Sequence, residues 1–213
     1  MLMNKIGKAI KFYVLATSLK NTIRTGWLKY HVSKERLESV AEHIYGTCIL
    51  AISIDSEFDT GIDLNKVLKM LVLHELEEVI IGDITPYDNV TKEEKLQKGK
   101  EAVDKILDEL VKKEEYVSLL DEFNQHITKE SKFAFFCDKL EACLQAKIYT
   151  EDNACDIFSK ENKELINHPS LNLLIKNGAT NLSDLFIEYD IDKFDDLFKK
   201  IAKYIKENDI SNK

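Results

Sequence analysis

Hydrophobic residues recur at helical spacing along most of the chain. Between residues 4 and 20 the apolar side chains fall three or four positions apart, as they do on one face of an α-helix. The same spacing returns at 33–55, 64–81, 112–127 and 130–150. Only 7 Gly and 2 Pro interrupt the chain, which favours long helices over the tight turns of a sheet. The pattern therefore predicts an all-α helical bundle.

Polar residues suited to cap a helix precede several of these segments, because their side chains can accept a hydrogen bond from the first turn. The candidate N-caps are Ser33 for 33–55, Asp63 for 64–81, Thr91 with Glu94 for the next helix, and Ser183 and Asp192 for two helices in the tail. The third helix is expected to stop at Gly82. We expect loops at IRTGWLKYHV (23–32) and GDITPYDNV (82–90).

The chain reads as one domain over residues 1–213. Its 213 residues are enough to bury a hydrophobic core without disulfide or metal cross-links, and neither a repeat nor a low-complexity linker divides them. The segments that carry candidate chemistry fall within about residues 10–150. Residues 151–213 are predicted to form a helical C-terminal extension.

The net charge and the cysteine content limit which classes of partner and which cellular compartment are expected. The net charge of −8 argues against nucleic acid, because neutralising a phosphate backbone needs clustered Lys and Arg. A small phosphorylated substrate needs only local positive charge. No stretch approaches the ~20 apolar residues that span a bilayer, which predicts no membrane partner. Four cysteines without a CxxC pair indicate reduced thiols in a cytoplasmic protein.

The segment 73–79, LHELEEV, is the most informative for chemistry. It places His74, Glu75 and Glu78 between apolar runs, with His74 and Glu78 one helical turn apart. Burying such groups without compensation costs several kcal/mol per charge. A divalent cation removes most of that cost, since imidazole and carboxylate are its natural ligands. The alternative is a solvated acidic stripe.

Two further polar residues stand in apolar helical patterns. His43 follows SVAE in the second helix, and Asp138 lies inside FAFFCDKLEACLQA. A buried acid needs a partner. Two histidines and two acids from three helices would satisfy one another through one metal ion. Such a site leaves open positions for water and substrate, as catalysis requires.

The chain resembles the HD-domain phosphohydrolases, in particular their YfbR-like 5'-deoxynucleotidase branch. Four separated stretches carry the resemblance, in family order over about residues 10–150. They are LKNTIRTGW, SVAEH, HELEEVIIGDITPYDN followed by KEEK, and FCDKLEACLQA. The combination is specific, because four motifs must all occur in sequence. Residues beyond about 150 show no usable resemblance.

The resemblance implies a metal site with His43, His74, Glu75 and Asp138 as ligands. Glu75 departs from the family pattern, which has aspartate at this position. Its extra methylene moves the carboxylate by about one bond length and adds a rotatable bond. The departure bears on metal affinity, on the choice of ion and on activity.

The resemblance also assigns roles around the metal. Glu78 and Asp83 match the acids that manage protons, Arg24 the arginine that contacts phosphate, and Trp27 the aromatic beside the sugar. The chemistry of Arg24 is consistent with the role that the resemblance implies, because its planar guanidinium group can donate hydrogen bonds to two phosphate oxygens. The alternative interpretations are a core tryptophan for Trp27, a turn-forming residue for Asp83 and an exposed helix carboxylate for Glu78.

The sequence therefore predicts a metal-dependent enzyme that removes the 5'-phosphate from deoxyribonucleoside 5'-monophosphates. Mn²⁺, Co²⁺ and Fe²⁺ all suit the ligand set. The resemblance further implies a homodimer. One alternative is an HD phosphohydrolase acting on a triphosphate, a cyclic nucleotide or a guanosine polyphosphate. The other is a nucleotide- or metal-binding regulator that has lost catalysis through Glu75.

Overall fold

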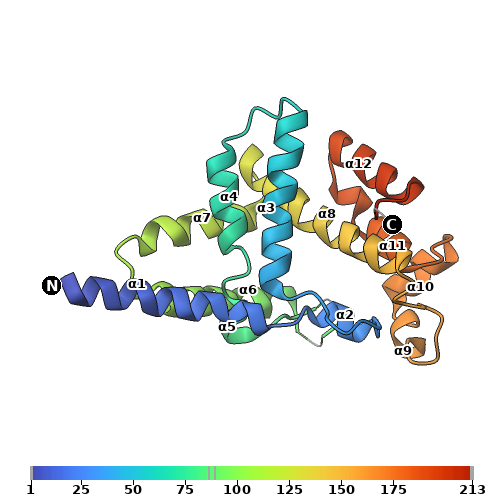
Figure 1. Ribbon diagram of the computed structural model, residues 1–213, viewed down its shortest axis with the longest axis horizontal. Coiled ribbons are helices and arrows are strands. Elements are labelled where there is room, and N and C mark those ends of the chain that lie inside the picture. The colour runs from blue at the N-terminus through green and yellow to red at the C-terminus, as the bar shows by residue number, and fades with distance from the viewer. Residues whose placement is uncertain (1, 86, 89, 212–213) are drawn as a thin grey trace. The chain divides into compact units, whose positions relative to one another are not determined.

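The computed structural model describes residues 2–85, 87–88 and 90–211, and every regular element within them is a helix (Figure 1). In chain order the elements are α1 (Leu2–Ala16), the 3₁₀ helix η1 (Thr17–Asn21), α2 (Thr25–Lys29), α3 (Val40–Glu57), α4 (Leu64–Leu73), α5 (Glu78–Ile81), α6 (Lys92–Leu107), α7 (Lys113–Gln125), α8 (Lys129–Glu151), α9 (Lys163–Ile166), α10 (Pro169–Lys176), α11 (Leu182–Asp190), the 3₁₀ helix η2 (Ile191–Lys193) and α12 (Asp196–Glu207). An isolated antiparallel bridge joins Ile23 to Ser39. The predicted all-α class is confirmed.

The contacts within the chain divide it into two compact units. Unit 1 comprises Met1–Thr25 and Glu38–Phe135, and unit 2 comprises Gly26–Leu37 and Phe136–Lys213. The division crosses α8, whose first turns belong to unit 1 and whose remainder belongs to unit 2. Nothing in the composition indicated a division of this kind, because no polar or flexible linker accompanies it.

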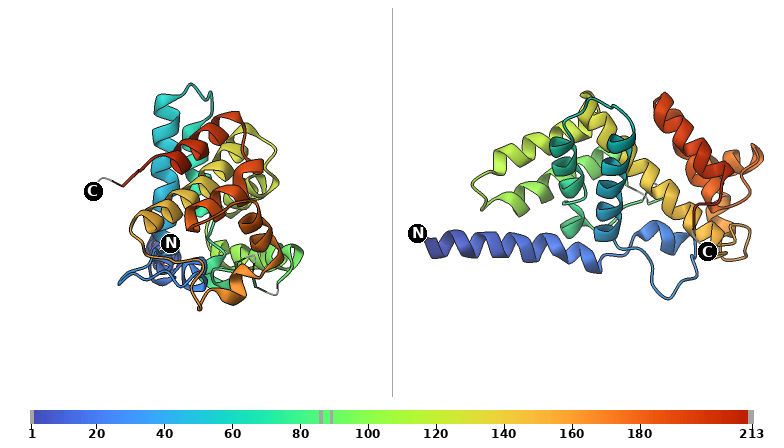
Figure 2. Two further views of the ribbon diagram at one scale, coloured as in Figure 1. Left: turned by 90° about the vertical axis from the view of Figure 1, so that its right-hand side faces the viewer. Right: turned by 45° about the horizontal axis from the view of Figure 1, so that its top comes forward.

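Unit 1 is built on two helix pairs, α3 with α4 and α6 with α7 (Figure 2). Apolar side chains from α6, α7 and the turn after α4 form a buried cluster, and each contributes roughly 1.5–3 kcal/mol on burial. Its members are Leu76, Val103, Ile106, Leu107 and Leu120. Leu76 anchors the segment of residues 74–78 in this core, so the polar side chains beside it have little freedom to move.

Unit 2 is organised by aromatic side chains. Trp27 of α2 stacks on Phe186 of α11 with ring centroids 5.0 Å apart, and Tyr149 of α8 meets the same indole edge-on at 5.2 Å. A second group contains Phe136, Phe194 and Phe198. Such pairs add roughly 0.5–1.5 kcal/mol beyond the area they bury. The C-terminal extension is thus part of the core of unit 2.

The start of α3 differs from the prediction. Its N-cap is Ser39, not Ser33, and the Ser39 side chain and Glu42 form a complete capping box. The physical reason is reciprocity: Glu42 lies three residues after Ser39 and returns a hydrogen bond, whereas Arg36 follows Ser33 at that spacing and cannot accept one. The box starts the helix six residues later than expected.

The predicted helix 64–81 is interrupted. Asp63 caps α4 as expected, and Gly82, with φ of 73°, ends α5, but α4 stops at Leu73. Across the gap the backbone bonds join residues three apart, as from Glu78 N–H to Glu75 C=O at 3.1 Å. This tighter winding is the geometry of a 3₁₀ turn, in which side chains three apart line up. Glu75 and Glu78 are therefore aligned, rather than His74 and Glu78.

Other boundaries were predicted with mixed success. The Thr91–Glu94 capping box is confirmed, and α7 and α8 lie within a few residues of their predicted spans. The segment 23–32 is not a loop throughout, because it contains α2. In the tail, Asn181 and Asp195 cap α11 and α12, in place of Ser183 and Asp192.

Two residues of the predicted 82–90 loop, Pro86 and Asn89, lie outside the described residues. Within the described ranges no helix is both long and apolar enough to cross a membrane.

The capping box can be tested by stability. Ser39→Ala removes the acceptor for the Glu42 N–H and should lower the free energy of unfolding by about 1 kcal/mol. Urea unfolding followed by circular dichroism measures this change. Ser33→Ala is the matched control, because the Ser33 backbone bond to Ala154 survives the substitution. Equal losses in both variants would show that Ser39 does not cap α3.

Candidate metal centre

His43 lies one turn into α3 and is fully buried, at 0% exposure. Its backbone N–H donates to the carbonyl of Ser39 at 3.1 Å, so the capping box sets the point at which this side chain leaves the helix. An amphipathic helix that buries a histidine must give its ring a polar environment. The ring faces His74, with the two centroids 5.5 Å apart.

His74 is the first residue after α4 and is also buried. Its Nδ1 lies 2.7 Å from the carbonyl oxygen of Leu71. A carbonyl only accepts, so Nδ1 carries the proton and, in the neutral ring, Nε2 carries a lone pair. A backbone partner on one nitrogen is the usual way in which proteins orient a histidine that binds metal through the other.

The Glu75 carboxylate is the point on which these groups converge. Its Oε1 lies 3.6 Å from Nε2 of His74 and 3.9 Å from Nε2 of His43. One donor atom from each of the three residues lies within 4.8 Å of the others. All three side chains are at least 87% buried, since the most exposed of them, Glu75, is at 13%.

This donor set fits a divalent metal ion. The Nε2 lone pair of His74 faces a carboxylate oxygen, and two acceptors at short range need a cation between them. Imidazole nitrogen and carboxylate oxygen are the ligands of Mn²⁺, Fe²⁺, Co²⁺ and Zn²⁺. Two atoms bound to one ion at about 2.1 Å are roughly 3–3.5 Å apart, so the observed spacing needs only slight closure.

Arg24 brings positive charge to the same carboxylate. Its Nη1 lies 3.5 Å from Oε1 of Glu75, and its side chain is 17% exposed. Two backbone contacts hold the Arg24 segment: the Arg24 N–H donates to the Glu38 carbonyl at 3.0 Å, and the Thr25 N–H donates to Oδ2 of Asp83 at 2.5 Å. The structure therefore brings Arg24 and Asp83 together with Glu75 in unit 1.

Glu78 is buried, at 2% exposure, rather than an exposed helix carboxylate. Burial, followed by the charges of Glu75 and Asp83, raises the pKa of Glu78 to about 11, and Arg24 and Lys95 oppose the shift. Lys95 Nζ lies 3.9 Å from Oε1 of Glu78. The other oxygen, Oε2, is buried and accepts no hydrogen bond from the described residues. In the metal-free chain, Glu78 thus holds a proton at neutral pH.

Asp138 and Trp27 belong to unit 2. Asp138 lies on α8, three residues beyond the last unit 1 residue of that helix, and is 5% exposed. The ammonium group of Lys139 lies 2.8 Å from its Oδ2. Trp27 is 1% exposed between Tyr149 and Phe186. This packing is that of a core tryptophan, which is the alternative interpretation of Trp27 in the sequence. The position of Trp27 beside the sugar of the substrate stays a prediction.

Sequence reasoning missed two lysines next to the candidate acids, Lys95 beside Glu78 and Lys139 beside Asp138. A signal was available for each, since Lys95 ends the KEEK stretch and Lys139 follows Asp138 directly. Lys95 also donates to the carbonyl of Ile84 at 3.0 Å, so it links α6 to the segment after Gly82.

Comparison with known proteins agrees with this geometry. A family model described as HD domain matches residues 16–173, which include parts of both units. The chain belongs to the HD-domain family. The family resemblance read from the four motifs is confirmed.

Relatives of this HD-domain protein carry a specific enzyme name. The protein named 5'-deoxynucleotidase HDDC2 from Xenopus laevis is 35% identical over 149 residues, covering 68% of this chain and 71% of its own. The human protein of the same name is 34% identical over 145 residues, with 67% and 68% covered. The 5'-deoxynucleotidase hdd1 of Schizosaccharomyces pombe is 37% identical over 142 residues, with 64% and 69% covered.

Solved structures share the fold. A protein described as a predicted metal-dependent phosphohydrolase from Magnetospirillum magnetotacticum matches with a TM-score of 0.66 at 19% identity, covering 95% of this chain and 91% of its own. The PH0347 protein from Pyrococcus horikoshii matches with a TM-score of 0.61 at 22% identity, with 91% and 98% covered. At these identities the likeness establishes the helical HD-domain fold.

The raised pKa of Glu78 predicts a pH-dependent gain in stability on substitution. The folded chain holds the proton up to about pH 11, whereas the unfolded carboxyl loses it near 4.5. Stability from Glu78 is therefore fully present below pH 4.5 and falls as pH rises. Glu78→Gln cannot ionise, so without metal it should exceed wild type in stability by a margin that grows from pH 5 to pH 8.

Urea unfolding in the presence of a chelator, at several pH values, measures that margin. Glu114→Gln, an exposed acid on α7, is the control and should show a far smaller change in its margin. A margin for Glu78→Gln that stays constant or shrinks over this range would contradict the burial of a protonated Glu78.

Proposed function

We propose that this chain is a metal-dependent phosphohydrolase that removes the 5'-phosphate from deoxyribonucleoside 5'-monophosphates. The observation that carries the proposal is the environment of Glu75, whose one carboxylate oxygen faces two imidazole nitrogens and a guanidinium group within 3.9 Å. A metal donor set and a phosphate-binding cation thus occur side by side. The relatives named 5'-deoxynucleotidase support the choice of substrate.

His43, His74, Glu75 and Asp138 would hold the divalent ion, with Mn²⁺, Co²⁺ and Fe²⁺ as candidates. When bound, such an ion supplies Lewis-acid chemistry: it lowers the pKa of a water ligand toward neutrality and polarises phosphate oxygens. Lys139 would orient Asp138 through its contact with Oδ2. Residues that steady a ligand in this way typically matter 10–100-fold for metal affinity.

Arg24 would bind the phosphate. Its guanidinium fork matches two phosphate oxygens, and its charge would offset the charge that builds on them during transfer. Asp83 accepts the Thr25 N–H and so holds the Arg24 backbone in place. We assign Asp83 this positioning role together with the predicted role near the leaving oxygen.

Glu78 would act as the general acid–base that transfers a proton from the attacking water. Its buried carboxyl has an oxygen that accepts no hydrogen bond from the described residues, and Lys95 stands at the other. Burial and the neighbouring acids Glu75 and Asp83 favour the protonated form of Glu78, whereas the charges of Arg24, Lys95 and a bound divalent ion would favour the ionised form. A carboxyl balanced in this way suits a general acid–base, which typically contributes 10²–10⁴ to the rate.

Trp27 would select the sugar. It follows Arg24 by three residues, and its indole is held rigidly between Tyr149 and Phe186. A rigid aromatic wall excludes an added hydroxyl by steric clash, which a flexible side chain would relieve. On this basis the enzyme prefers 2'-deoxy substrates.

The proposal includes a cytoplasmic location and a homodimer. All four cysteines, Cys48, Cys137, Cys143 and Cys155, are free, as expected in a reducing compartment.

The test is the ratio of kcat/KM for a matched pair, deoxyadenosine and adenosine 5'-monophosphate, measured by phosphate release with Mn²⁺ or Co²⁺. We expect the deoxy substrate to be cleaved at least about 10-fold faster, in line with steric exclusion of a small group. Arg24→Ala should lower kcat/KM for both substrates by about 10²-fold or more, because it removes a phosphate ligand.

Arg36→Ala, an exposed arginine, is the control and should retain activity. Equal rates on the two sugars would refute the sugar selection alone. Absence of hydrolysis with every divalent ion, despite tight nucleotide binding, would favour the regulator over the enzyme.

A further inference from the structure

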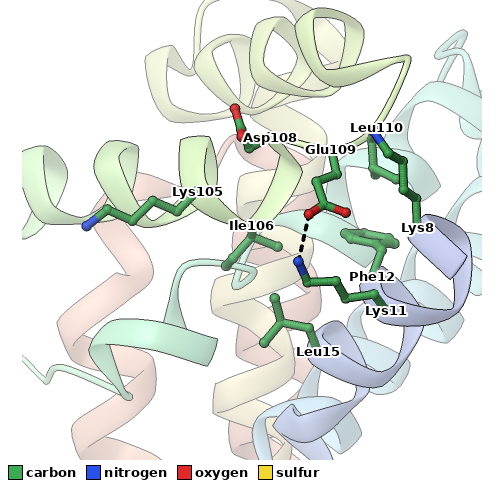
Figure 3. A pocket seen from close by; sticks show the side chains of 9 residues that line it. All are labelled: Lys8, Lys11, Phe12, Leu15, Lys105, Ile106, Asp108, Glu109 and Leu110. Atoms are coloured by element: carbon green, nitrogen blue, oxygen red, sulfur yellow. Dashed lines mark hydrogen bonds and ion pairs between the residues drawn. The ribbon is translucent and has the colours of Figure 1, made fainter. Parts of the chain in front are cut away.

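Helix α1 is held to the rest of unit 1 along one side only. Phe12 and Leu15 pack against the apolar cluster that includes Ile106 of α6, and Lys11 pairs with Glu109 at 2.8 Å (Figure 3). A cavity of about 200 Å³ remains between the two helices. No residue of α1 is buried. A helix of 15 residues is marginal in water unless tertiary packing supports it.

The other side of α1 carries a continuous apolar stripe, which consists of Met3, Ile6, Ile10 and Tyr13. Their spacing of three, four and three residues is the repeat that keeps one helix face against a partner helix. These side chains are 47–78% exposed, and Leu2 and Val14 beside them are 72% and 61% exposed. Exposed apolar stripes of this length mark interaction surfaces.

The residues that flank the stripe indicate whether its partner is another helix or a lipid surface. In the helical repeat, the flanking positions are taken by Gly7, Ala9 and Ala16, together with Leu2 and Val14. They are small or apolar, so another helix can approach closely and without repulsion between like charges. Lys5, Lys8 and Lys11 fall on the remaining part of the helix.

That placement of lysines disfavours a lipid surface. A helix that lies on an anionic membrane carries its basic residues where they reach the headgroups beside the inserted apolar face. Here Lys8 and Lys11 line the cavity beside α6 (Figure 3). By helical spacing, this is the side of α1 away from the stripe. The stripe is therefore bordered by no charge that would hold it at a membrane.

The exposed area suits a self-associating surface. Six large apolar side chains that each bury on the order of 100 Å² give about 600 Å² per copy, near the ~800 Å² per partner of a standard interface. A stripe that is apolar along its whole length is complementary to a second copy of itself, as a two-fold interface requires.

We infer that the α1 stripe is the surface on which a second copy of this chain docks, through pairing of the two α1 helices. The inference gives the homodimer of the proposed function a defined surface, and it does not depend on the catalytic assignment. It also accounts for the stability of α1, whose apolar face becomes buried in the dimer.

The experiment measures the mass of the full chain by sedimentation equilibrium across a concentration series. Wild type should be a dimer at micromolar concentration, and the double variant I6E/I10E should be a monomer, because four carboxylates would be buried in the interface without partners. Val111→Glu, at a residue 91% exposed between α6 and α7, is the matched control and should remain dimeric.

Further measurements keep the inference distinct from misfolding and from catalysis. Circular dichroism should show the folded HD domain in the double variant, and an Ile10→Cys variant should cross-link to a covalent dimer under oxidation. A monomeric wild type, or a double variant that dimerises with unchanged affinity, would overturn the inference. Co-sedimentation of wild type with anionic vesicles, lost in I6E/I10E but not in Val111→Glu, would assign the stripe to a membrane and likewise overturn it. Phosphate release by each variant, measured in parallel, reports on the proposed activity alone.

Discussion

The buried carboxylate of Glu75 is the constraint to which the surrounding structure responds. Three groups turn toward its Oε1, the imidazoles of His43 and His74 and the guanidinium of Arg24. Because Nδ1 of His74 donates a hydrogen bond to Leu71, the Nε2 that faces Glu75 carries a lone pair. Arg24, which lies 3.5 Å from Glu75, offsets the charge of the carboxylate but provides no partner for this lone pair. A divalent ion satisfies the carboxylate and the imidazole lone pairs together.

Local departures from regular helix build this environment. The tight turn after α4 brings Glu75 and Glu78 into line, and burial, followed by the charge of Glu75, raises the pKa of Glu78. The bridge between Ile23 and Ser39 joins the segment before Arg24 to the cap of α3, which positions His43. Both departures from regular helix lie next to the candidate chemistry.

Sequence reasoning recovered the helical class, the family and the residues that meet at Glu75, because apolar periodicity and motif order are local signals. It missed the 3₁₀ turn at residues 74–77, since an uninterrupted apolar pattern gives no sign of tighter winding. It also did not foresee the contact of Trp27 with Phe186, which depends on a tail that shows no motif. Long-range packing of this sort is not encoded in any short segment.

The most direct measurement is the affinity of the metal-free chain for Mn²⁺ by titration calorimetry, with Glu75→Gln, Glu75→Asp and the exposed control Glu115→Gln. Glu75→Gln keeps the size of the side chain and removes the charge, so the dissociation constant should rise at least about 100-fold, more than loss of a supporting residue causes. Glu75→Asp should still bind one ion per chain. Unchanged affinity in Glu75→Gln would contradict the metal centre proposed here.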